Sequence, residues 1–179
     1  CEQTIVAGIR SMMLTENPVR DASLLRESIL TSFGLSGDKK NAAEKDGQAL
    51  AAFTCALHRF AVITGGPGTG KTTTIGKILK ILREQRPSVR IAVAAPTGKA
   101  ALRLKEGIAA NQDLPPDFAA EVAGSTVTAH RLLGRMGRTY RHNIQNPLPY
   151  DIVILDEASM IDTPMMARIL QALGPQTSL

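Results

Sequence analysis

The fold is indicated most directly by the stretch Gly65-Gly66-Pro67-Gly68-Thr69-Gly70-Lys71-Thr72, which Thr73 follows. Its spacing, G-x-x-x-x-G-K-[ST], is that of a phosphate-binding loop. An apolar run over residues 61–64 precedes the stretch, and a helical pattern over residues 71–85 follows it. Glycines let successive backbone N–H groups point into one concavity, and the helix adds its positive N-terminal end. This order predicts a loop that binds phosphate between a strand and a helix.

Two side chains of this loop carry the expected chemistry. The Lys71 amine can reach the β- and γ-phosphates of a nucleoside triphosphate, and the Thr72 hydroxyl can bind Mg²⁺. ATP and Mg²⁺ are therefore the expected ligands. The alternative is a glycine-rich turn with a chance lysine, and the strand and helix expected on either side argue against it.

Short apolar runs alternate with helical patterns along the rest of the chain. The apolar runs cover residues 61–64, 91–95 and 152–155. Helices are expected over residues 48–58, 71–85 and 98–110 and after Thr163, the expected cap, with Pro164 as first helical residue. A proline-containing stretch between residues 110 and 152 is expected to be irregular. Short strands between helices are typical of a parallel α/β sheet covered on both faces.

The first 46 residues are expected to form a helical segment and a linker. Asn17 and Pro18 indicate a helix N-cap and first residue, and apolar residues then recur at helical spacing until Gly34. Residues 36–47 are polar and charged, which indicates a linker. We therefore expect an N-terminal helical segment over residues 1–46 and a larger α/β unit over residues 47–179.

Composition limits the classes of protein and partner. Hydrophobic residues make up 44% of the 179 residues and charged residues 21%, which is ordinary for a globular protein, and no apolar run approaches the ~20 residues that cross a bilayer. Cys1 and Cys55 are too few for a disulfide framework, so a reducing, cytoplasmic setting is expected, with Cys55 as a small core residue. The net charge of +5 suits a polyanion, but 3% aromatic residues favour contact with a nucleic-acid backbone over base stacking.

A pair of carboxylates, Asp156 and Glu157, ends the third apolar run. In a parallel sheet the carboxyl ends of the strands form the ligand crevice. Asp156 is then expected to hold Mg²⁺ together with Thr72, and Glu157 to orient and deprotonate an attacking water. The alternative is that Asp156 only caps the next helix. A kinase would not need the Asp-Glu pair, so the pair favours hydrolysis of a nucleoside triphosphate.

Four motifs in this order resemble those of superfamily 1 helicases. They are the phosphate-binding loop, AAPTGKAA at residues 94–101, TAHRLLG at residues 128–134 and ILDEASMID at residues 154–162. Their combination is similar to the RecD family, the alpha subunits of exonuclease V (RecBCD), over about residues 48–173. The resemblance implies a RecA-like fold, an ATP-dependent 5′-to-3′ DNA helicase acting in double-strand break repair and recombination, and single-stranded DNA, RecB-like and RecC-like partners.

The same resemblance implies roles for further residues. Gln48 lies 17 residues before Gly65, where such helicases place a glutamine that reads adenine; a surface glutamine is the alternative. The resemblance also implies that a turn binds a DNA phosphate through Pro96, Thr97, Gly98 and Lys99. The alternative is an ordinary turn between a strand and a helix. Thr128 and His130 resemble another DNA-contacting motif, or are packed or capping residues.

A basic segment runs from Arg131 to His142 and begins within the third of these motifs. It contains four arginines and no acidic residue, namely Arg131, Arg135, Arg138 and Arg141. It is interpreted either as a surface for DNA or a partner subunit, or as a solvated basic loop.

Two alternatives to a helicase motor remain open: a scaffold subunit switched by nucleotide, and a phosphate-loop kinase. The chain starts without Met and contains neither the Gly-Asp-Gln motif nor the second motor domain of the family, so it is expected to be a fragment without helicase activity. The strand that should separate residues 61–64 from residues 152–155 is also expected to be missing. The fragment would then be marginally stable, with Thr72 and Asp156 farther apart than a shared Mg²⁺ permits.

Overall fold

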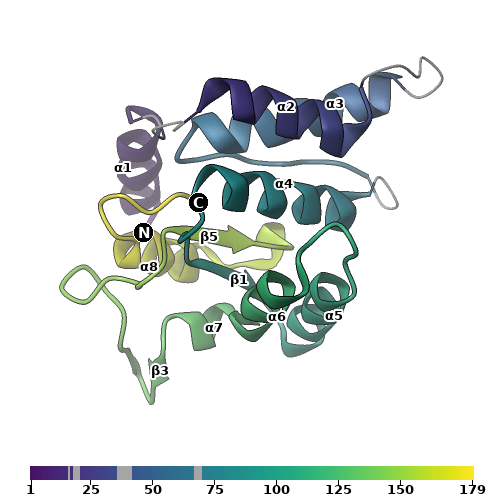
Figure 1. Cartoon of the computed structure of the whole chain (residues 1–179). Coiled ribbons are helices and arrows are strands. Elements are labelled where there is room, and N and C mark those ends of the chain that lie inside the picture. The colour runs from purple at the N-terminus through teal and green to yellow at the C-terminus, as the bar shows by residue number, and fades with distance from the viewer. Residues whose placement is uncertain (16, 18–20, 36–41, 67–69) are drawn as a thin grey trace.

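The computed structural model describes residues 1–15, 17, 21–35, 42–66 and 70–179, without the side chains of residues 42–46 and 72. The helices are α1 (Glu2–Met13), α2 (Ala22–Phe33), α3 (Ala42–Leu57), α4 (Lys71–Gln85), α5 (Gly98–Ala109), α6 (Pro116–Gly124), α7 (Ala129–Leu132), the 3₁₀ helix η2 (Ala158–Met160) and α8 (Thr163–Ala172). The strands are β1 (Ile91–Ala95), β2 (Thr126–Thr128), β3 (Arg135–Met136), β4 (Thr139–Tyr140) and β5 (Ile152–Leu155) (Figure 1).

The central sheet consists of three parallel strands in the order β2-β1-β5. Side chains of β1 alternate between its two faces: Ile91 and Val93 lie in one apolar cluster with α2 to α6, and Ala92 and Ala94 lie in a second with α7 and α8. All five residues of β1 are buried, as a strand between two helical layers requires. The predicted α/β fold, a parallel sheet covered on both faces, is confirmed and is consistent with a RecA-like phosphate-loop NTPase.

Residues 61–64 do not form the predicted strand. The side chains of Val62 and Ile63 are 70% and 37% exposed. Only Ala61 in this run pairs with a neighbour among the described residues, donating its N–H to the carbonyl of Leu179 at 3.0 Å. An apolar run becomes a strand only where a neighbouring strand supplies hydrogen bonds along its length, and this run has one such bond.

Residues 177–179 lie in the gap that was expected to be empty. Ser178 pairs in parallel with Ile152 of β5, and Leu179 donates its N–H to the carbonyl of Arg59 at 2.7 Å. Within the described residues no strand lies between β5 and residues 61–64, as expected, but residues 177–179 occupy this place with single pairings. The sheet is extended here by single pairings, which join segments far apart in the sequence.

Two helices start at other residues than predicted. α2 begins after Asp21, whose carboxylate accepts hydrogen bonds from the first turn, and not at Asn17 and Pro18. Asn17 instead donates its backbone N–H to α3, and Pro18 lies outside the described residues. α2 ends at Gly34 with φ of +61°, as the glycine predicted. α8 is capped by Asp162, so Thr163 is its first residue and not its cap.

Two stretches predicted to lack regular structure contain helices. Residues 42–47, predicted to be linker, form the first turns of α3; the linker residues 36–41 lie outside the described residues. α6 lies within the stretch predicted to be irregular, because Pro116 stands at its first position, where a proline fits without losing a hydrogen bond. β2 was also not predicted, because three residues are too short for a recognisable apolar run.

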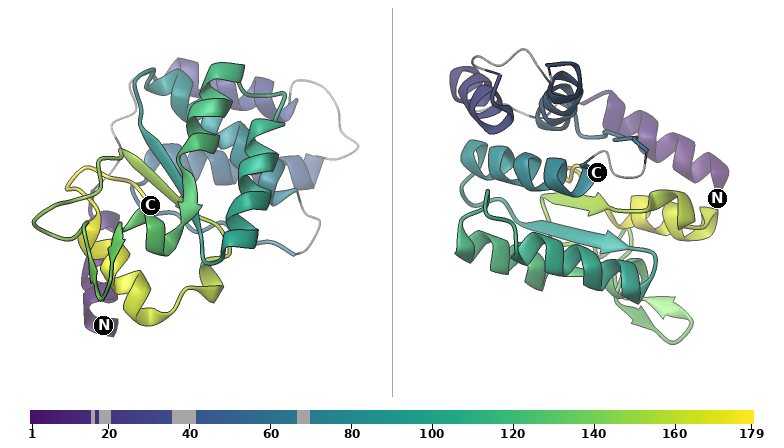
Figure 2. Two further views of the ribbon diagram at one scale, coloured as in Figure 1. Left: turned by 90° about the horizontal axis from the view of Figure 1, so that it is seen from below. Right: turned by 90° about the vertical axis from the view of Figure 1, so that its right-hand side faces the viewer.

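The N-terminal helices pack on the α/β unit. α2 contacts α3 and α4, and α1 contacts α8, an arrangement that both views of Figure 2 show. A Cβ built on Gly8 of α1 would lie 3.3 Å from the Cβ of Leu170, so the glycine permits the close approach of α1 to α8. Within the described part of the chain, no helix has the length and apolar character that crossing a membrane requires.

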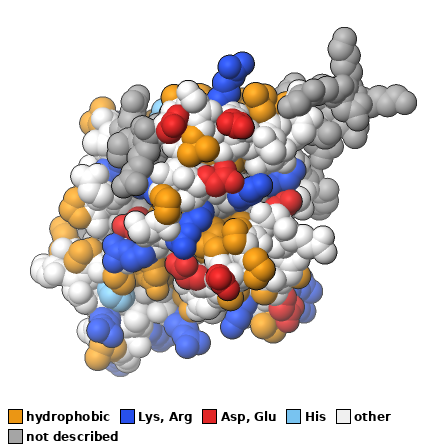
Figure 3. All heavy atoms as spheres, in the orientation of Figure 1, with side chains coloured by type: hydrophobic (Ala, Val, Ile, Leu, Met, Phe, Trp, Pro, Cys, Tyr) orange, Lys and Arg blue, Asp and Glu red, His pale blue; other side chains and the backbone are white. Residues whose placement is uncertain are grey.

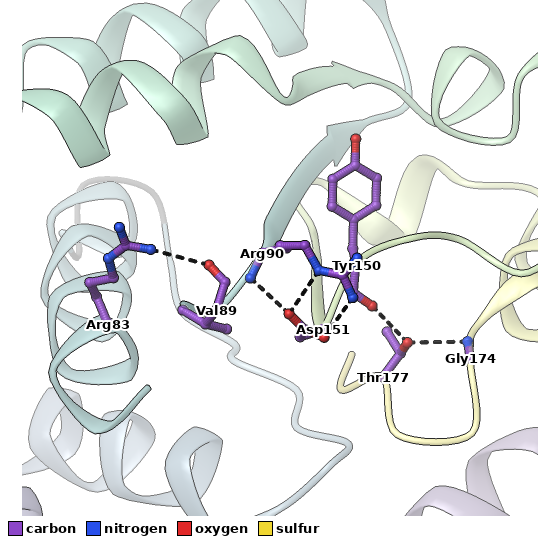
Figure 4. Close-up of polar contacts among 7 residues, drawn as sticks. All are labelled: Arg83, Val89, Arg90, Tyr150, Asp151, Gly174 and Thr177. Carbon is purple, nitrogen blue, oxygen red and sulfur yellow. Dashed lines mark hydrogen bonds and ion pairs between the residues drawn. The ribbon is translucent and has the colours of Figure 1, made fainter. Parts of the chain in front are cut away.

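Polar contacts join β1, β5 and the C-terminal turn at the amino edge of the sheet (Figure 4). Arg90 donates from its backbone, Nε and Nη2 to the carboxylate of Asp151 at 2.9, 3.2 and 3.0 Å. The hydrogen-bonded guanidinium lowers the pKa of Asp151. Thr177 Oγ1 donates to the carbonyl of Tyr150 at 2.8 Å and accepts from the backbone N–H of Gly174 at 3.1 Å. The Arg90–Asp151 pair joins the starts of β1 and β5, whereas the two bonds of Thr177 fix where residues 177–179 lie beside β5.

Candidate nucleotide-binding site

A cavity of about 430 Å³ lies between α3, residues 61–65 and the start of α4. Its walls are mostly apolar, with a few polar groups at one end. The residues that line it are Gly47, Gln48, Leu50, Ala51, Thr54, Ala61, Val62, Ile63, Thr64, Gly65, Lys71 and Thr74. An apolar cavity with few converging polar groups is the usual form of a small-molecule site.

Lys71, the first residue of α4, is one of the polar residues that line the cavity. Its amine donates hydrogen bonds to the carbonyls of Gly65 and Gly66 at 2.8 and 2.7 Å. Gly70, the N-cap of α4, has φ of +72°, a conformation that a residue with a Cβ adopts only with strain. The carbonyls of Gly65 and Gly66 therefore hold the positive charge of Lys71 beside the N-terminus of α4.

Gln48 lies next to the same loop. Its Nε2 atom is 3.2 Å from the position that a Cβ on Gly70 would occupy. A side chain at residue 70 would therefore press on this amide, so the glycine serves both the turn and the close approach. The structure brings together Gln48, Gly65, Gly70 and Lys71, which the sequence assigned to nucleotide binding from separate motifs.

Several nucleotide-site residues are placed only in part. Pro67, Gly68, Thr69 and the side chain of Thr72 lie outside the described residues, so the predicted Mg²⁺ pairing of Thr72 with Asp156 stays a prediction. Thr73 is exposed. Sequence reasoning did not single out Thr74, which lines the cavity and whose hydroxyl donates to the carbonyl of Gly70 at 3.0 Å. Only its adjacency to the motif could have indicated it.

Asp156 and Glu157 follow the carboxyl end of β5, where the sequence placed them. Asp156 donates its N–H to the carbonyl of Ala94 at 2.9 Å, so the β1–β5 pairing continues to this residue. Glu157 has φ of +52° and ψ of +39° and is the one described residue other than glycine with a positive φ. Such a conformation costs about 1–2 kcal/mol and persists where the surroundings enforce it, often at functional sites. Neither carboxylate is among the described residues that line the cavity.

The predicted DNA-contacting residues lie along the same edge of the sheet as the carboxylates. Ala95 at the end of β1 pairs with Thr128 at the end of β2, and all three strands are parallel. Thr97 and Thr128 cap α5 and α7, accepting hydrogen bonds from the backbone N–H groups of Ala100 and Arg131 at 3.2 and 3.3 Å. Both residues therefore have the capping role that was the structural alternative, while their hydroxyl hydrogens remain available as donors.

Charged side chains stand exposed along this edge. Pro96 is half-buried, whereas Gly98, Lys99 and His130 are exposed. His130 is not buried, and its ring lies 6.3 Å from that of Tyr140. The sheet topology thus brings three separate motifs to one rim, where a strand of nucleic acid could contact Lys99 and His130.

The basic segment forms a projecting hairpin, β3–β4, that follows α7 (Figure 1). Its four arginines, Arg131, Arg135, Arg138 and Arg141, are all exposed. Figure 3 shows Lys and Arg side chains along the lower side of the molecule, the side on which the hairpin lies in Figure 1. The exposure of these charges fits a binding surface and a solvated loop equally.

Comparison with known proteins agrees with this geometry. The family model described as "AAA domain" matches residues 48–179. The chain is 46% identical over 142 residues to the RecBCD enzyme subunit RecD of Mycolicibacterium smegmatis, covering 74% of this chain and 26% of that protein. It is 40% identical over 144 residues to the RecBCD enzyme subunit RecD of Haemophilus influenzae, covering 75% of this chain and 22% of that protein. The ATP-dependent RecD2 DNA helicase of Deinococcus radiodurans is 40% identical over 119 residues, covering 66% of this chain and 14% of that protein. The chain thus spans about a quarter of the length of its RecD relatives.

Proposed function

Because the chain belongs to the AAA domain family, we propose that it is the nucleotide-binding part of an ATP-dependent DNA helicase subunit of the RecD type. The family implies nucleotide use, and the relatives narrow this to ATP hydrolysis coupled to movement along DNA. As the resemblance to the RecD family implies, the whole protein would move 5′-to-3′ along single-stranded DNA and act in double-strand break repair in the cytoplasm. It would bind RecB-like and RecC-like subunits, as the RecBCD naming of its relatives suggests.

One observation carries this proposal: the Lys71 amine and the Gln48 amide stand at the same cavity, beside the N-terminus of α4. An amine next to a helix N-terminus suits the phosphates of a nucleotide. An amide offers a donor and an acceptor, which suits the edge of adenine. The apolar walls between them, which include Leu50 and Val62, suit the base and sugar.

Asp156 and Glu157 supply the negative groups that hydrolysis needs. Asp156 would hold Mg²⁺ together with the Thr72 hydroxyl, and the bound ion would draw charge from the phosphate oxygens. Glu157 would orient the attacking water and accept its proton. The strained backbone at Glu157 supports this role, because it fixes the direction in which the carboxylate leaves the end of β5.

The edge of the sheet would hold the DNA strand. Lys99 and His130 are exposed there. The N-terminus of α5 beside Thr97 and the hydroxyl of Thr128 would donate hydrogen bonds to DNA phosphates. Because β1, which leads into the turn at Thr97, pairs with β5, which leads into Asp156 and Glu157, a shift of the DNA-contacting turns would be felt at these carboxylates. We also propose the division into a helical segment (1–46) and a partial motor domain (47–179), with α2 packed on α3 and α4.

The test is ATP hydrolysis by the full-length protein with and without single-stranded DNA. Lys71→Ala should abolish turnover, and Glu157→Gln should keep ATP binding but block hydrolysis. Lys77→Ala is the matched control, because Lys77 lies on the same helix but contacts the Phe33 ring and does not line the cavity. Wild-type turnover in Lys71→Ala, or hydrolysis that DNA does not stimulate, would contradict the proposal.

A further inference from the structure

The segment that enters the phosphate-binding loop is tied at its start by a buried polar cluster. The cluster joins three distant parts of the chain and consists of Thr15, Asn17, Arg59, Thr177 and Ser178. Asn17, Arg59, Thr177 and Ser178 are all at least nine-tenths buried. It has no part in the proposed chemistry, so its contacts call for a separate explanation.

Arg59 lies at the centre of this cluster. Its Nη1 donates to Thr15 Oγ1 at 2.8 Å and its Nη2 to the carbonyl of Thr177 at 2.9 Å. Its side chain is 8% exposed, its Nε is without a hydrogen-bond partner, and no carboxylate pairs with it among the described residues. Burying a cation against neutral acceptors is costly. A planar fork that reaches two segments at once is what an arginine, and not a lysine, supplies at such a position.

Asn17 ties the N-terminal segment to the same place. Its backbone N–H donates to the carbonyl of Leu57 at 2.8 Å, and its Nδ2 donates to the carbonyl of His58 at 2.9 Å. Its Oδ1 accepts from Ser178 Oγ at 2.9 Å. The end of α3 is therefore bound on one side by residue 17 and on the other by residues 177–179.

The chain that follows Arg59 depends on this cluster for its position. Residues 61–64 form a wall of the cavity but have no strand on which to rest, and Val62 is 70% exposed. Ala61 is held by Leu179 at one end of this wall, and Gly65 is held by Lys71 at the other. Leu179 is fixed in turn through Thr177, which Tyr150 and Gly174 hold in place (Figure 4).

We propose that Arg59 is a positioning residue for the nucleotide cavity: by joining Thr15 and Thr177, it fixes the wall at residues 61–64. This inference rests on the proposed function. The N-terminal segment is then coupled to the nucleotide site, although Thr15 and Asn17 do not line the cavity. Coupling of this kind is reciprocal, so bound nucleotide stabilises the contacts of Thr15 and Asn17 as much as those contacts strengthen nucleotide binding.

The first measurement is the Kd of the full-length protein for a fluorescent ATP analogue. Arg59→Met should raise Kd about five- to twentyfold, the lower part of the ordinary range for coupling between sites, and leave kcat within about twofold because Arg59 does not touch the reacting groups. Arg59→Lys should recover part of the loss. Arg90→Met is the matched control, because it also removes a hydrogen-bonded arginine but at the amino edge of the sheet; its Kd should equal that of the wild type.

The second measurement is hydrogen exchange at the backbone N–H groups of Asn17, Ala61 and Leu179. Saturating the wild type with the analogue should slow their exchange, and in Arg59→Met the slowing should be lost. A merely structural role would change exchange without nucleotide but not its response to nucleotide. If Arg59→Met does not fold, the same two measurements on Thr15→Val test the proposal, because Thr15 is exposed and its replacement leaves the core intact.

The outcomes separate the two proposals. A wild type that does not bind the analogue overturns the proposed function, and this inference with it. A wild type that binds, together with an unchanged Kd in folded Arg59→Met or in Thr15→Val, overturns the inference alone. Equal increases of Kd in Arg59→Met and Arg90→Met would also overturn it, because they would show a general loss of stability.

Discussion

The strained backbone at Glu157 can be measured by replacing the residue with glycine and with alanine. Both substitutions remove the carboxylate, so their difference isolates the backbone. At φ of +52° and ψ of +39°, a residue with a Cβ destabilises the folded state by about 1–2 kcal/mol relative to glycine. Glycine gives back about 0.4–1 kcal/mol through the greater freedom of the unfolded chain. Glu157→Gly should therefore be more stable than Glu157→Ala by about 0.8 kcal/mol, the difference between the middles of the two ranges.

The assay is urea denaturation of the two variants and the wild type, followed by circular dichroism. If the unfolding free energies of the two variants fall equally steeply with urea concentration, the expected difference in stability separates their urea midpoints. Gly124, the last residue of α6, provides the matched control, because its φ is not positive and Gly124→Ala should not be destabilising. If Glu157→Ala is as stable as Glu157→Gly, or more stable, residue 157 is not held in the left-handed conformation, and the argument that the backbone directs its carboxylate is refuted.

Three further predictions concern reactivity, pH and DNA. Burial raises the pKa of the Cys55 thiol to about 11, so iodoacetamide at neutral pH should modify exposed Cys1 and spare Cys55 until the chain unfolds; equal rates in the native protein would contradict this. The guanidinium of Arg90 lowers the pKa of Asp151 below its ordinary value of 3.8, so this pair stabilises the fold above that pH and stops doing so as the pH falls through the lowered pKa. The difference in unfolding free energy between wild type and Asp151→Asn should therefore shrink in acid, and a constant difference would refute the pairing. Lys99→Ala should weaken single-stranded DNA binding equally for all sequences and reduce the salt slope by about one, whereas an unchanged slope would show that Lys99 is only solvated.

Sequence patterns predicted the elements whose local signals agree with their surroundings. β1 and β5 are apolar throughout and lie between helical layers, so their bounds follow from the sequence alone. α4 begins where the loop motif ends, at Lys71. The run over residues 61–64 carries the same local signal, but a strand also needs a neighbour, and the sequence of one segment does not show whether that neighbour is there.

The candidate site was predictable to the same extent. The loop motif indicated Lys71 and Gly70, and the distance along the chain indicated Gln48. Arg59 could not be found in this way, because its partners Thr15 and Thr177 are 44 and 118 residues away and neither forms a motif with it. Contacts between hydroxyls, carbonyls and one buried cation follow from tertiary packing and have no signal in local sequence.

The contacts of Lys71 change what a binding measurement on this residue would report. Its amine already makes two short hydrogen bonds to the carbonyls of Gly65 and Gly66. The ammonium has three N–H donors, so one phosphate oxygen can take the third, but any further phosphate contact must replace one of these carbonyls. For such a contact the affinity attributable to Lys71 is the difference between two satisfied states and not the full strength of an ammonium–phosphate contact. Removing the amine also frees the two carbonyls, and the loop loses a cross-link of its own. A substitution at residue 71 therefore alters the unliganded protein as well as the complex, and the two effects partly cancel in the measured affinity.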